Sequence, residues 1–156
     1  MISKEEDKMV SMGFNSINEG FDEGVSKALN FLTEIGTGYL NERKEPEAEK
    51  TVVSIKEIGK AATLQGMENA AVNAIRALER LLQCSIEQNM QDTTIRVLLS
   101  FGAIGKTAAD KIKKNGSDLT SLPPLPAGNA QMLCIVCCGV EDGIRTHGLQ
   151  SHNLAL

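Results

Sequence analysis

The chain has 156 residues, an apolar fraction of 42 %, an aromatic fraction of 3 % without any Trp, and a formal net charge of −4 at pH 7. This length can bury one core, and the acidic balance argues against broad, non-specific binding of nucleic acid. The core must be built from Leu, Ile, Val, Ala and Met, whose side chains suit closely packed helices.

The cysteines and the hydropathy pattern bear on the cellular compartment. Cys84 stands alone and Cys134, Cys137 and Cys138 form a group, which is not the pattern of a secreted disulfide framework. No apolar run approaches the ~20 residues of a membrane helix, and the start of the chain carries no basic-then-apolar leader. We therefore expect a cytoplasmic protein without membrane association.

An internal repeat of 23 residues organises about the first 115 positions. Ser54–Ala62 reads SIKEIGKAA and Ser100–Ala109 reads SFGAIGKTAA, so that two Ile-Gly pairs lie 46 positions apart. Within each unit apolar residues recur at i, i+3 and i+6, which predicts one apolar helical stripe per unit. The three columns hold Leu29, Val52, Ile75 and Leu98, then Leu32, Ile55, Leu78 and Phe101, then Met12, Ile35, Ile58, Leu81 and Ile104.

The boundaries of the units repeat as well. Gly20, Gly66 and Asn89 share a column where a residue with positive φ would end a helix. Acidic residues, or Pro46, follow where the next helix would start. The turns should therefore be short, which makes consecutive helices antiparallel neighbours. The predicted helices are Ser3–Glu19, Glu23–Glu42, Pro46–Gln65, Asn69–Gln88 and Asp92–Lys114.

Two helices per 46 residues match the ~40–47-residue period of HEAT and armadillo repeats. Over Met9–Lys114 the chain resembles these α-superhelical repeat proteins, and also uncharacterised helical-repeat proteins of methanogenic archaea. The resemblance implies an all-α repeat domain at residues 1–116 that binds a protein partner, and it brings no catalytic residue with it.

The array is short for such a repeat. Five helices make about two and a half repeats, fewer than the roughly three usually needed for stability. We therefore expect an uncovered apolar face, which leads either to a homo-oligomer through an end helix or to docking of the apolar run Gln131–Val140.

Glycines recur in the Ile-Gly pairs at Gly36, Gly59 and Gly105. A glycine inside a helix costs about 1 kcal/mol relative to Ala, so something must offset that cost. We predict that these glycines lie beside the core stripe, where a missing side chain lets a neighbouring helix approach closely. A kink or a ligand contact is the alternative.

The repeat register stops after Lys114. Residues 117–130 have the Pro, Ser and Gly content of a linker, and residues 131–156 combine an apolar Cys-containing run with a tail that we expect to be disordered. The segment Asp142–Leu156 contains GIRTH and resembles the conceptual translation of a frame that runs antisense into a tRNA gene.

One metal pattern falls in this tail. Cys134, Cys137, His147 and His152 are spaced C-x2-C-x9-H-x4-H, superficially like a zinc site with two thiolates and two imidazoles. The nine-residue middle spacing is shorter than the usual twelve of a zinc finger. If the tail is the translation of an antisense frame, the Cys and His spacing was not selected for metal binding. Zinc is the one possible cofactor, and otherwise none is expected.

Catalytic motifs are weak or missing in the repeat. Gly102–Thr107 ends in the GKT of a phosphate-binding loop, but Ser100 stands where the first Gly of that loop belongs, and the stretch is predicted to be helical. Residues 1–114 contain no His, no paired carboxylates and no nucleophile-base pair. We therefore expect a protein that is not an enzyme.

The best candidates for partner binding are basic residues. Lys27, Lys50 and Arg96 share one column of the register, and Lys106 and Lys111 lie on the last predicted helix. Repeat proteins align equivalent surface residues into stripes, although cations near a helix end also have a purely structural role. We expect a non-catalytic protein-interaction scaffold. The alternatives are a zinc-dependent regulatory or nucleic-acid-binding protein, and a truncated repeat array without present function.

Overall fold

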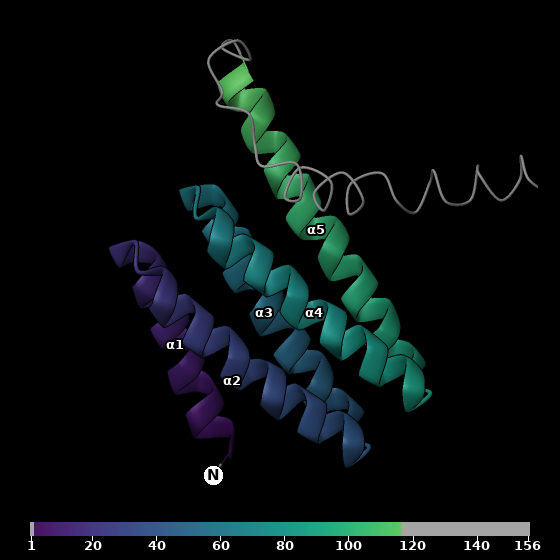
Figure 1. The fold of residues 1–156 in the computed structure, drawn as a ribbon. Helices are drawn as coiled ribbons and strands as arrows, with labels where there is room; N and C mark the ends of the chain where they lie inside the picture. Colours follow the sequence, from purple (N-terminus) through teal and green to yellow (C-terminus); the bar gives the residue numbers. More distant parts are fainter. Residues whose placement is uncertain (1, 117–156) are drawn as a thin grey trace, which may run out of the picture.

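A computed structural model describes residues 2–116, and they form five α-helices without a strand in that range. The predicted linker and tail, residues 117–156, lie outside the described residues. The all-α prediction is confirmed, and every predicted helix end falls within one residue of the observed one. The helices are α1 (Ile2–Glu19), α2 (Asp22–Asn41), α3 (Glu45–Gln65), α4 (Glu68–Glu87) and α5 (Gln91–Asn115) (Figure 1).

The helices form two layers. Helices α1, α3 and α5 make one layer and α2 and α4 the other, with consecutive helices antiparallel (Figure 1). Helices of the same layer are therefore two units of the 23-residue register apart. Helix α3 packs against α5 more extensively than against α1, and α5 forms the C-terminal edge of the array.

The turns between α1 and α5 share one geometry. Gly20, Gly66 and Asn89 have φ values of +70°, +79° and +56°, as their column predicts. Arg43 occupies the same column and has a φ of +57°. In each turn the next residue donates its N–H to the carbonyl five residues earlier, as Phe21 does to Ser16 at 2.8 Å. This is the Schellman ending of a helix, and it makes each reversal short.

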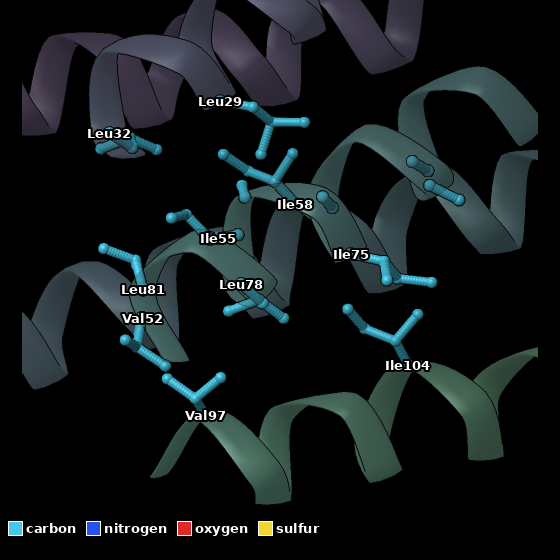
Figure 2. Packing of buried hydrophobic residues seen from close by; sticks show 14 of the residues in the cluster. Leu29, Leu32, Val52, Ile55, Ile58, Ile75, Leu78, Leu81, Val97 and Ile104 are labelled. Atoms are coloured by element: carbon cyan, nitrogen blue, oxygen red, sulfur yellow. The ribbon is translucent and has the colours of Figure 1, made fainter. Parts of the chain in front are cut away.

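The apolar columns meet in one core. Figure 2 shows side chains from α2, α3 and α4 packed together, with Val97 and Ile104 extending toward them from α5. Fully buried members are Leu29, Leu32, Val52, Ile55, Ile58, Ile75, Leu78, Leu81, Val97 and Ile104.

The columns depart from this pattern at the two edges of the array. Leu98 is 48 % exposed although Leu29, Val52 and Ile75 in the same column are buried. Met12 and Ile35 are only partly buried. The cause is position, because no further described helix packs on the outer side of these residues.

Buried polar groups are satisfied within the described region. The carboxylate of Glu6 is buried in α1 and accepts a hydrogen bond of 3.0 Å from the Thr51 hydroxyl in α3. Every buried side-chain nitrogen or oxygen atom of the described residues has a hydrogen-bond partner. None of the described helices is long and apolar enough to cross a membrane.

Candidate functional site

The Ile-Gly glycines mark close contacts between helices of one layer. A Cβ atom on Gly59 would lie 2.7 Å from Ile104 Cδ1 and 2.9 Å from Ala74 Cβ, and one on Gly36 would lie 2.9 Å from Leu81 Cδ2. Ile104 and Leu81 are the apolar residues that precede the glycine column two helices later. Each glycine thus receives a side chain from the next helix of its own layer, which is a packing contact. Gly105 is buried in α5.

Polar side chains repeat this two-helix spacing. Arg96 in α5 donates to Glu49 in α3 at 2.9 Å, and the Thr93 backbone N–H donates to Glu45 at 3.1 Å. In the other layer Asn73 donates to Ser26 at 2.9 Å. The hydrogen bonds in this set join residues 47 or 48 positions apart. They fix how far each helix slides along its neighbour.

The structure gives most of the predicted binding cations a contact inside the molecule. Lys27 lies 3.9 Å from Glu23 on its own helix, and Lys50 lies 3.7 Å from Asp7 in α1. Both pairs are exposed, so each contributes at most about 1 kcal/mol.

The remaining three predicted cations lie on α5. Arg96 pairs with Glu49, Lys111 donates to the Thr63 carbonyl at 3.0 Å near the end of α3, and Lys106 is exposed. Successive members of a register column lie on helices of alternate layers. The five cations are therefore not brought together on one surface stripe. Their role in partner binding stays a prediction.

The GKT sequence is ordinary helix. Gly102–Thr107 lies inside α5, and the Thr107 hydroxyl donates to the Ala103 carbonyl at 2.9 Å. A phosphate loop needs free backbone N–H groups that converge on the anion, whereas a helix uses them internally. The prediction of a helix in place of a loop is confirmed.

Candidate catalytic and metal chemistry is sparse in the described region. Among residues 2–116 no three His, Cys, Asp or Glu side chains are grouped as a metal site. The predicted zinc ligands Cys134, Cys137, His147 and His152 lie outside the described residues. Burial, with the nearby Glu87 carboxylate, raises the pKa of the Cys84 thiol. Cys84 is therefore a poor source of thiolate.

The most distinctive surface is an apolar row on α5. We define the α5 stripe as Ile95, Leu98, Gly102, Ala109 and Ile112, which are spaced three, four, seven and three positions apart. Ile95, Leu98 and Ile112 are 55 %, 48 % and 50 % exposed. This spacing keeps all five on one line of the helix, as in the seam of a coiled coil.

The repeat register shows what the α5 stripe corresponds to. Helix α5 covers the face of α3 that contains Glu45, Glu49, Val52 and the Thr63 carbonyl. The positions 46 residues later on α5 are Gln91, Ile95, Leu98 and Ala109.

The face of α5 that contains the stripe is thus equivalent to the face of α3 that α5 covers. It is also more apolar, because Ile95 and Ala109 replace Glu49 and Thr63. The sequence signal for the stripe is a second apolar line on the last helix, which shares only Leu98 with the core columns. The core columns placed Leu98 with residues that are buried, and they did not include Ile95 or Ile112.

A hollow of about 310 Å³ adjoins the N-terminal end of the stripe at the turn between α4 and α5. Its lining includes Ile86, Met90, Thr94 and Ile95. Ile86 is 57 % exposed, which extends the apolar surface from α5 onto the end of α4.

No protein family, curated protein or solved structure matches this chain.

Proposed function

We propose that this protein is a non-catalytic interaction module that binds a protein partner through the α5 stripe. The HEAT-like reading of the repeat supports the proposal, because such arrays act through extended surfaces. The observation that carries it is the exposure on α5 of a face whose copy on α3 is covered by the next helix of the layer.

The energetic reason lies in the exposed aliphatic side chains. Burying one Leu or Ile side chain contributes about 1.5–3 kcal/mol, and Ile95, Leu98 and Ile112 are each about half exposed. Isolated apolar side chains on a surface are common, but an aligned row along one helix marks an interaction site. The exposed cation Lys106 lies on the same helix and would form part of a polar rim beside the row, whereas Lys111 faces the end of α3.

The test compares the wild-type chain with two single substitutions. Leu98→Glu places a charge in the stripe, and Leu64→Glu makes the same change at a leucine of α3 that is 60 % exposed and outside the stripe. Each tagged full chain is used to retain proteins from an extract of the cells that encode it, including untagged copies of the chain. We expect at least one protein to be retained by the wild type and by Leu64→Glu but lost with Leu98→Glu. Retention that is the same for all three would refute the proposal.

A further inference from the structure

We propose that the partner at the α5 stripe is a second copy of this chain, with the two α5 helices antiparallel across a two-fold axis. The inference rests on the proposed function and names its partner. It follows from which surfaces of the same molecule do and do not fit the stripe.

The register does not continue as an apolar pattern in the same chain. Because consecutive units alternate between the two layers, the unit that would cover α5 in its own layer lies 46 positions on. There the columns that hold Leu98, Phe101 and Ile104 read Ile144, His147 and Gln150. Two of the three large apolar residues are replaced by polar ones, so the sequence does not repeat the pattern that covers α3.

The opposite edge of a second copy does not fit either. A head-to-tail array would seat α1 on α5 as α5 is seated on α3. The α1 residues equivalent to Arg96, Val97 and Ser100 are Lys4, Glu5 and Lys8, all exposed. Three charged side chains would face an apolar row, at a desolvation cost that nothing on the row offsets.

The stripe fits itself when the helices run antiparallel. Its large residues Ile95, Leu98 and Ile112 lie toward the two ends, and its small residues Gly102 and Ala109 lie between Leu98 and Ile112. A two-fold axis near residues 103 and 104 places Leu98 over the partner's Ala109. The molecule already uses this type of contact, because Ile104 seats on Gly59. A Cβ on Gly102 would meet no atom within 4 Å, so the axis is open to close approach.

The same pairing gives the hollow an occupant. The two-fold axis that joins Leu98 to the partner's Ala109 also places Ile95 opposite the partner's Ile112. The hollow beside Ile95 is apolar at Ile86 and Met90. The partner's Ile112 would therefore extend the apolar contact to the end of α4.

Charge is complementary in the antiparallel arrangement. The N-terminal end of α5 carries Asp92 and its C-terminal end carries Lys113 and Lys114. Antiparallel packing brings Asp92 next to the partner's Lys113 and the partner's Lys114, and it opposes the two helix dipoles favourably. Within one α5 helix Asp92 and Lys113 are about 31 Å apart at 1.5 Å per residue, so any coupling between them has to be intermolecular.

A charge-reversal experiment on the full chain tests this arrangement. The variants are Asp92→Lys, Lys113→Glu with Lys114→Glu, and all three changes together, and the readout is the dimer dissociation constant from sedimentation at low ionic strength. Reversal of either end should weaken the dimer roughly tenfold, because two symmetric contacts turn repulsive. The combined variant should return to within about twofold of the wild type. The matched control is Glu23→Lys, the equivalent helix-start position of α2, which should leave the dimer unchanged.

The outcomes separate this inference from the proposed function. A wild-type chain that stays monomeric over a wide concentration range, as it would if the apolar run Gln131–Val140 covered the stripe, overturns the inference. A dimer in which the combined variant restores nothing overturns it as well. If another protein is still retained in a Leu98-dependent way, the proposed function stands and only the identity of the partner is wrong. If the wild-type chain is monomeric and no protein is retained in a Leu98-dependent way, both the inference and the proposed function are wrong.

Discussion

Gly59→Ala adds one methyl group where α3 lies close to side chains of α4 and α5. The new Cβ would lie 2.7 Å from Ile104 Cδ1 and 2.9 Å from Ala74 Cβ. The Ile104 methyl can move, but Ala74 Cβ is fixed by its backbone, so α4 itself must shift. Overpacking of this kind costs about 1–3 kcal/mol, against a helix-propensity gain of about 1 kcal/mol. We expect net destabilisation by up to about 2 kcal/mol, measured by urea unfolding at fixed protein concentration.

The control is the same substitution where space is free. A Cβ on Gly38 in α2 would meet no atom within 4 Å, so Gly38→Ala should stabilise the fold by up to about 1 kcal/mol. Adding Ile104→Val to Gly59→Ala removes the first of the two close contacts and should recover part of the loss. If Gly59→Ala stabilises the protein as much as Gly38→Ala does, the close-packing role of this glycine is refuted.

Three further outcomes follow from individual contacts. Thr51→Val keeps the shape of the side chain but leaves the buried Glu6 carboxylate without its hydroxyl donor, so unfolding free energy should fall by about 1–3 kcal/mol; an unchanged value would contradict the role of this bond. Because the pKa of the Cys84 thiol is raised, its alkylation, followed by peptide mass spectrometry, should be slower in the folded chain than in urea, and equal rates would contradict this. A hydrogen bond from Lys56 lowers the pKa of Glu57, so the unfolded state takes up this proton first as the pH falls. The carboxylate stabilises the fold above its unfolded pKa of about 4.3 and loses that effect as the pH falls through the lower folded pKa. Glu57→Gln should therefore lower the unfolding free energy by less than about 1 kcal/mol near neutral pH, because the pair is still partly exposed to solvent, and should leave it unchanged near pH 2; an equal loss at both pH values would be inconsistent with the linkage.

The helix boundaries could be predicted because two independent signals coincide in the register. The apolar columns give each helix a core-facing side, and the residues with positive φ, such as Gly20 and Gly66, end it. Arg43 has the same backbone geometry but could not be predicted, since Arg has no preference for a positive φ. There the hydrogen bonds of the turn impose the conformation on an unfavourable residue.

The surface could be predicted less well than the core. A repeat register predicts which residues of successive helices are equivalent, but it does not predict which helices have a further helix packed against them. For this reason Leu98 is exposed although the other residues of its column are buried. The pairing of Arg96 with Glu49 depends on how far α5 slides along α3. That offset is set by the packing of the whole layer, and no local pattern in the sequence encodes it. For the same reason the shared column of Lys27, Lys50 and Arg96 did not translate into one surface stripe.

The mass of the protein in solution tests the role of the α5 stripe most directly. One chain has a mass of 16.8 kDa, and light scattering across a concentration series should approach twice that mass for the wild type and for Leu64→Glu. Leu98→Glu should stay at the mass of one chain while keeping the helical circular dichroism of the wild type. A dimer that survives Leu98→Glu unchanged, or a wild type that is monomeric throughout, would contradict the assignment of this face as the place where two copies meet.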